Sequence, residues 1–70
     1  MKINLPSGKG DDIQATTYSE DSSKRVVITK TEDRKGYSIA LHCNRFPGMP
    51  TVFRGLSKKG VIDEANEYLN

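Results

Sequence analysis

The sequence has very few of the residues from which catalytic and metal sites are usually built. It contains one cysteine, Cys43, one histidine, His42, and no tryptophan. A single cysteine excludes a disulfide within the chain, and one histidine beside one cysteine is too small a ligand set for a zinc site. Adjacent strand residues point to opposite faces, so His42 and Cys43 are not expected to form a nucleophile–base pair. We therefore expect no enzymatic activity, no metal and no cofactor.

Long apolar runs are also absent. Hydrophobic residues make up 34% of the 70 residues, the mean hydropathy is −0.64, and no segment approaches the ~20 apolar residues of a membrane span. The first residues, Met1 to Pro6, contain no apolar stretch of signal-peptide length. Low cysteine usage favours a reducing compartment. These absences predict a soluble, cytoplasmic protein with no membrane partner, and a chain of this length predicts one thin core without a deep substrate cavity.

Acidic residues are missing from the middle of the chain. Between Asp33 and Asp63 there is no aspartate or glutamate, whereas the same stretch holds six basic residues: Arg34, Lys35, Arg45, Arg54, Lys58 and Lys59. The other five basic residues and all nine acidic ones lie outside it, so a charge of +6 inside and −4 outside gives the net +2. Positive charge concentrated in one stretch is typical of proteins that bind a polyanion such as DNA or RNA.

Alternating and β-branched segments predict the strands of an antiparallel sheet. Residues 25–31 are β-branched almost throughout, and residues 37–43 alternate between larger apolar side chains and smaller or more polar ones. Weaker strand patterns cover residues 13–19 and 51–54, and turn-forming residues separate the four segments. Residues 1–12 are rich in turn formers and are expected to be either a flexible arm or a short edge strand.

One helix is expected at the C-terminal end, because Ser57 is a favourable N-cap for the apolar pattern that follows it. Apolar residues recur at helical spacing on one side and acidic residues line the other: Val61, Ile62, Ala65, Tyr68 and Leu69, against Asp63, Glu64 and Glu67. The chain is thus expected to form a single small α+β domain over residues 1–70. Its architecture is an antiparallel meander sheet of three to five strands with the C-terminal helix packed on one face, which leaves the other face open.

The start of this helix carries the most specific local pattern, Gly55-Leu56-Ser57-Lys58-Lys59. Lysines in the first turn oppose the helix dipole at a cost of about 0.3–1 kcal/mol each. Lysines and helix N-termini nevertheless both bind phosphate. The pattern is therefore compatible either with a phosphate contact or with a solvated first turn.

A strand followed by Gly and then by Ser-Lys-Lys at a helix start resembles the C-terminal half of a double-stranded RNA-binding domain. The resemblance covers residues 25–70 at most, and it implies that Ser57, Lys58 and Lys59 contact phosphates and recognise the shape of the duplex. The order of strands and helix also resembles the small DNA-binding modules at the front of some phage integrases. In those modules the sheet enters the major groove, and the likeness concerns the fold alone.

A second candidate site is the segment from Phe46 to Met49, with Arg45 beside it, at the tip of the last expected hairpin. Apolar side chains exposed at such a tip usually have a partner. Three interpretations remain open: Phe46 and Met49 insert between bases, anchor a protein partner, or fold back onto the core.

The sequence favours a small non-enzymatic nucleic-acid-binding module, with DNA and RNA both open as partners. The residues expected to contact nucleic acid are Arg34, Lys35, Arg45, Arg54, Ser57, Lys58 and Lys59. The alternative is a small protein-binding regulator of the phage, plasmid or accessory type, which acts through a sheet edge or the Phe46–Met49 tip and can form a homodimer. Because successive hairpins of a meander lie at opposite ends of the sheet, the cations form either one band or two separate patches.

Overall fold

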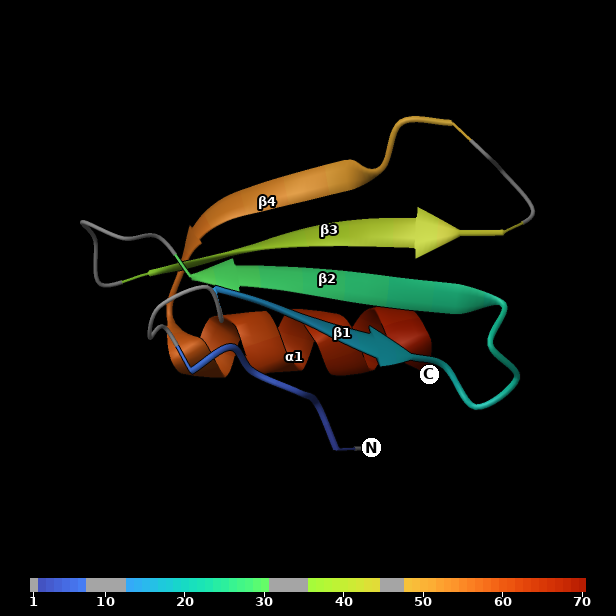
Figure 1. Ribbon diagram of the computed structural model, residues 1–70, viewed down its shortest axis with the longest axis horizontal. Helices are drawn as coiled ribbons and strands as arrows, with labels where there is room; N and C mark the ends of the chain where they lie inside the picture. The colour runs from blue at the N-terminus through green and yellow to red at the C-terminus, as the bar shows by residue number, and fades with distance from the viewer. Residues whose placement is uncertain (1, 8–12, 31–35, 45–47) are drawn as a thin grey trace.

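The computed structural model describes residues 2–7, 13–30, 36–44 and 48–70. These residues form four strands and one helix: β1 (Gln14–Tyr18), β2 (Lys24–Lys30), β3 (Tyr37–Cys43), β4 (Thr51–Leu56) and α1 (Lys58–Leu69). The strands pair antiparallel in chain order, and α1 lies along one face of the sheet (Figure 1). The expected fold class, a meander sheet with one C-terminal helix, is confirmed. Within the described part of the chain, no helix has the length and apolar character needed to cross a membrane.

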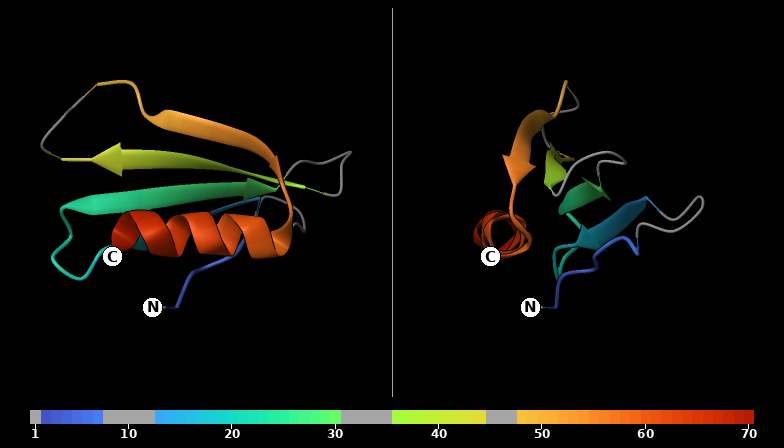
Figure 2. Two further views of the ribbon diagram at one scale, coloured as in Figure 1. Left: turned by 180° about the vertical axis from the view of Figure 1, so that it is seen from behind. Right: turned by 90° about the vertical axis from the view of Figure 1, so that its left-hand side faces the viewer.

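The core lies between α1 and the two central strands. Strands β2 and β3 direct alternate apolar side chains toward the helix because successive residues of a strand face opposite ways. The helix presents apolar residues one turn apart to meet them. The buried set is Val26, Ile28 and Ile39 from the sheet and Val61, Ala65 and Leu69 from α1. A view along the strands shows α1 on one side of the sheet, and no described helix or strand covers the other side (Figure 2).

Strand β4 is longer than the sequence pattern indicates. The expected strand ended at Arg54, because the glycine that follows is usually a strand breaker, but the structure continues it to Leu56. Gly55 has a φ of 73°, a left-handed conformation that glycine adopts without steric cost. This residue accommodates a β-bulge in the ladder with β3 and leads the chain toward α1.

Residues 2–7 form no strand, but they are attached to the fold by specific contacts. Ile3 and Leu5 pack against the core. Between them, the backbone N–H of Asn4 donates to Oγ1 of Thr17 (2.8 Å) and its side-chain amide donates to the carbonyl of Thr16 (3.0 Å). The described part of the N-terminal segment therefore lies against the outer edge of β1; residues 8–12 lie outside the described residues.

The turn between β1 and β2 is organised by one carboxylate. Asp21 accepts hydrogen bonds from the hydroxyl of Ser19 (2.9 Å) and from the hydroxyl and backbone N–H of Ser23 (2.7 and 3.0 Å). These donors stabilise the charged form and lower the pKa of Asp21 from 3.8 to about 2, the Ser23 hydroxyl contributing most. Ser22 at the tip adopts a left-handed φ of 62°. The turn fixes the register in which Tyr18 pairs with Arg25.

The two faces of β2 give a matched test of this packing. Val26 is fully buried against α1, whereas its neighbour Val27 is half-buried on the opposite face. We expect Val26→Ala to lower the free energy of unfolding by about 2 kcal/mol or more, because it leaves a cavity in the core. Val27→Ala is expected to cost less than half as much. Urea unfolding followed by circular dichroism measures both, and equal losses would contradict one-sided packing.

Candidate nucleic-acid interface

The face of the sheet that α1 leaves uncovered is the candidate interface. Strand register places its residues in rows that cross the sheet, so that Tyr18, Arg25 and His42 are direct neighbours on β1, β2 and β3. We call this surface the open face. Its members are Gln14, Thr16, Tyr18, Arg25, Val27, Thr29, Ser38, Ala40, His42, Val52 and Arg54.

The carboxylates of α1 and the open face lie on opposite sides of the sheet, whereas cations lie on both sides, because Lys24 contacts Tyr68 of the helix and Lys58 and Lys59 begin it. The open face carries two arginines and one histidine, and none of its residues is acidic. The acidic residues of α1 lie on the opposite side, where Asp63 and Glu67 are exposed. A polyanion approaching the open face would therefore meet cations first, with these helix carboxylates behind the sheet.

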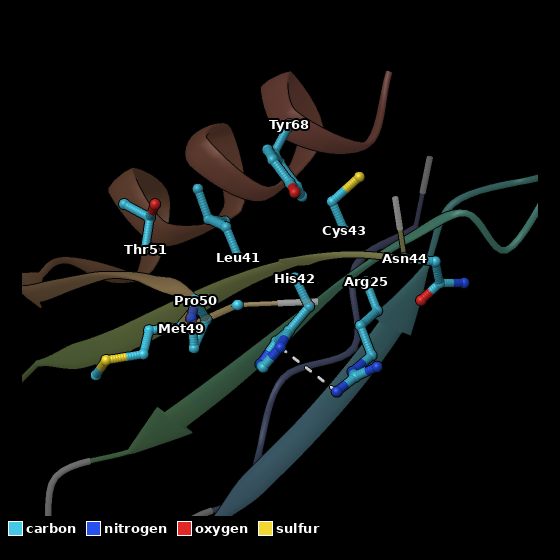
Figure 3. A pocket seen from close by; sticks show the side chains of 10 residues that line it. Arg25, Leu41, His42, Cys43, Asn44, Met49, Pro50, Thr51 and Tyr68 are labelled. Atoms are coloured by element: carbon cyan, nitrogen blue, oxygen red, sulfur yellow. Dashed lines mark hydrogen bonds between the residues drawn. The ribbon is translucent and has the colours of Figure 1, made fainter. Parts of the chain in front are cut away.

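Arg25 and His42 form the polar centre of one row. Nη2 of Arg25 lies 3.4 Å from Nδ1 of His42, and both side chains are half-buried on the open face (Figure 3). Tyr18, the next residue in the row, is 57% exposed. Guanidinium, imidazole and phenol groups are the ones that proteins use to donate to phosphates and base edges and to stack on bases. The row thus supplies a basic and aromatic cluster that no single stretch of sequence contains.

A groove adjoins this cluster at the end of the sheet where β3 and β4 separate. The ladder between them ends at the pair Leu41–Thr51, and residues 48–50 lie away from β3. The groove has a volume of about 610 Å³, and its lining joins both faces: Arg25, Leu41, His42, Cys43, Asn44, Gly48, Met49, Pro50, Thr51 and Tyr68 (Figure 3). A small planar or anionic group therefore has room next to Arg25 and His42.

The helix-facing wall of the groove is formed by Cys43 and Tyr68. Burial raises the pKa of the Tyr68 hydroxyl, and the neighbouring Cys43 adds to the effect. Lys24 lies over the Tyr68 ring at 5.4 Å from its centre, and its ammonium donates to the Tyr68 carbonyl at 3.4 Å. Cys43 and His42 point to opposite faces, as the strand pattern predicts, and so do not form a catalytic pair.

The start of α1 forms a second basic cluster, the β4–α1 corner, defined by Arg54, Ser57, Lys58 and Lys59. Ser57 caps the helix: its hydroxyl accepts from the N–H of Gly60 at 3.0 Å, as expected from the sequence. The N–H groups of Lys58 and Lys59 belong to the first turn, where the helix supplies no acceptor of its own. None of the described carboxylates forms an ion pair with Arg54, Lys58 or Lys59, so these cations add to the positive potential at the corner.

Four of the expected contact residues, and Met49 of the expected tip, lie in the described part of the chain. Arg54, Ser57, Lys58 and Lys59 are exposed where β4 leads into α1. Met49 is 98% exposed, so the interpretation in which it folds back onto the core is wrong for this residue. Arg34, Lys35, Arg45 and Phe46 lie outside the described residues.

The cluster of Tyr18, Arg25 and His42 was not found from the sequence. Arg25 lies outside the acid-free stretch between Asp33 and Asp63, and it is 17 positions away from His42 in the sequence. The available signal was the alternation in β2, which places Arg25 with Val27 and Thr29 on the face opposite the core. Pairing that face with the polar side of β3 would have identified the row.

Comparison with protein-family models, curated proteins and solved structures finds no match to this chain. The resemblances to a double-stranded RNA-binding domain and to integrase DNA-binding modules therefore remain predictions. The case for function depends on the chemistry of the open face and the β4–α1 corner.

The geometry of the Arg25–His42 contact predicts one tautomer. A guanidinium group only donates, so a hydrogen bond to Nδ1 requires that this nitrogen carry no proton. We expect neutral His42 to carry its proton on Nε2, which long-range ¹H–¹⁵N correlation spectra report directly. Arg25→Ala should allow the Nδ1–H form to appear. A neutral His42 already protonated on Nδ1 in the unmodified protein would contradict the contact.

Proposed function

We propose that the protein is a small nucleic-acid-binding module that binds through the open face of its sheet. The proposal is carried by one observation: among the described residues, the sheet face that the helix leaves uncovered has arginines and no acidic residue, while the exposed carboxylates of α1 lie on the other side with Lys24, Lys58 and Lys59. A surface with this distribution attracts the phosphate backbone and orients the domain with its helix away from the ligand.

The shape of the open face suits a groove. The major groove of DNA is about 12 Å wide and admits a two-stranded β-ribbon. Here the central ribbon is β2 and β3, whose open-face side chains are mostly small, among them Val27, Thr29, Ser38 and Ala40. Small side chains allow the backbone to approach base edges closely. The outer strands β1 and β4 would then lie toward the phosphate walls, with Tyr18 on one and Arg54 on the other.

The basic residues divide into two roles. Arg25 lies on the central ribbon, and its fork of donors matches the acceptors of guanine in the major groove, so it is the candidate for base recognition. Lys58 and Lys59 lie at the end of the sheet, where a point charge contacts phosphate without reading sequence. His42, held beside Arg25, supplies a second donor from the neighbouring strand.

A protein partner is the second candidate, favoured by the apolar side chains exposed around β4. Met49 is 98% exposed, Val52 46% and Phe53 40%. Exposed apolar residues at a sheet edge are typical of strand addition or of anchoring into a partner. Capture of a partner at high salt, reduced by Met49→Ala and unaffected by Lys58→Glu, would favour this function over nucleic-acid binding.

Substitutions at the two clusters are expected to weaken nucleic-acid binding in different ways. The double variant Lys58→Glu/Lys59→Glu should bind all sequences less tightly and lower the slope of log K against log salt by about 2, because two phosphate contacts are lost. Arg25→Ala should reduce discrimination between preferred and unrelated sequences by about 1–3 kcal/mol. Fluorescence anisotropy with duplex DNA, duplex RNA and single strands at two salt concentrations measures both effects.

Lys2→Ala is the charge-matched control for Arg25→Ala, because Lys2 is exposed and is not one of the open-face residues. It should leave both affinity and discrimination close to those of the unmodified protein. If Arg25→Ala behaves like Lys2→Ala, the open face is not the binding surface. If none of the three nucleic acids binds even at low salt, the proposed function is wrong.

A further inference from the structure

The two edges of the sheet differ in how they are covered. At the β1 edge, the side-chain amide of Asn4 donates a hydrogen bond to the carbonyl of Thr16, and residues 2–7 lie alongside the strand. At the β4 edge, five of the six strand residues are exposed, and no described segment runs alongside the strand (Figure 1). An exposed strand edge is a template for pairing with another strand. The β4 edge is therefore the one available for association.

The backbone direction along β4 follows from the ladders. The N–H of Asn44 donates to the carbonyl of Ser23, so the even-numbered residues of β3 direct their backbone N–H and C=O groups toward β2. The alternating residues, Ile39 and Leu41, therefore direct their backbone groups toward β4. Ile39 and Leu41 pair with Phe53 and Thr51, which consequently bond inward. The residues between and beyond them, Val52 and Arg54, direct their N–H and C=O groups outward. The flat part of this edge ends at the Gly55 bulge.

We propose that β4 pairs antiparallel with β4 of a second copy of this chain, with Phe53 directly opposite the partner's Phe53. The arrangement joins two four-stranded sheets into one continuous sheet about a two-fold axis. In this register Val52 lies opposite the partner's Arg54, and Arg54 opposite the partner's Val52. Each of these pairs exchanges two backbone hydrogen bonds through the outward groups, and the central Phe53 pair is a non-hydrogen-bonded one.

A second register, centred on Val52, would also keep the open faces of the two copies on the same side of the joined sheet. The position of Pro50 disfavours that register. Centring the pair on Val52 instead would place Pro50 opposite the partner's Arg54. Proline has no N–H to donate, so that register loses hydrogen bonds at both ends. Centring on Phe53 keeps Pro50 outside the paired segment.

Side chains on both faces of β4 favour a second copy as the occupant. Phe53, on the helix-facing side, meets the partner's Phe53 in a close aromatic pair. Val52, on the open face, meets the aliphatic stem of the partner's Arg54, so the two arginines are offset along the strand and do not oppose each other. The same strand thus supplies both members of each contact, Phe53 with Phe53 on one face and Val52 with Arg54 on the other, as an isologous contact requires.

The dimer would extend the open face across the two-fold axis into a surface with two copies of the Tyr18–Arg25–His42 row. The β4 contact uses none of the three residues of that row, but it does use Arg54 of the open face. The dimer is tested without nucleic acid, so its failure and the failure of the proposed function are distinguishable. Its paired segment is short, so association is expected to depend on protein concentration.

Sedimentation analysis of the full chain over a wide concentration range tests the dimer. Val52→Pro removes only an outward-facing N–H of β4, and Gln14→Pro removes the equivalent outward N–H of β1. We expect the unmodified protein and Gln14→Pro to shift from monomer to dimer, and Val52→Pro to remain monomeric. A protein that is monomeric throughout, or one whose dimer persists in Val52→Pro, would overturn the proposal.

Disulfide trapping tests the register in a Cys43→Ser background. Phe53→Cys should give a covalent dimer with diamide as oxidant, because opposed non-hydrogen-bonded residues lie within disulfide distance. Val52→Cys, offset from its own copy, should give far less. Circular dichroism checks that both variants fold. Preferential trapping of Val52→Cys would show that the register is wrong, and equal trapping would show random collision.

Discussion

The packing of α1 against one face of β2 and β3 is the interaction on which the rest of the structure depends. The core holds six buried apolar residues, three from the sheet and three from the helix. A chain of this size has enough apolar material to cover one face of its sheet and not both. One-sided packing therefore accounts for the fold and also for the existence of an open face.

One-sided packing also places the carboxylates of α1 away from the open face. Exposed positions of α1 must face away from the sheet, so Asp63 and Glu67 lie on the side opposite the open face. The positions of β2 and β3 that alternate with the core residues must face away from α1, so Arg25 and His42 lie on the open face together. Strand and helix periodicity thus leave the open face with arginines and no carboxylate, whereas the helix side carries both carboxylates and lysines.

Much of the fold was predictable because it depends on local periodicity. The alternation in residues 37–43 gave the bounds of β3, and Ser57 was correctly identified as the cap of α1. The continuation of β4 past Gly55 was not predictable in this way, since a glycine at a bulge and a glycine that ends a strand look alike in sequence. The contacts of Asn4 with β1 likewise depend on residues distant in the chain.

The candidate site was only half predictable for the same reason. The β4–α1 corner is nearly contiguous in sequence, so its residues could be named from the sequence as candidates. The Tyr18–Arg25–His42 row requires three strands in a defined register, which the β1–β2 turn around Asp21 helps to set. The sheet edges show a similar dependence, because only the folded chain reveals that Asn4 covers part of β1 and leaves β4 available.

The most direct test of the account is an NMR titration of the protein with a short DNA duplex, followed by backbone amide shifts. Open-face residues such as Arg25, Thr29 and Ala40 should shift strongly and in proportion to occupancy. Residues on the outer side of α1, such as Asp63 and Glu67, should not move. Shifts concentrated on the helix, with the open face unchanged, would contradict the claim that the uncovered side of the sheet is the binding surface.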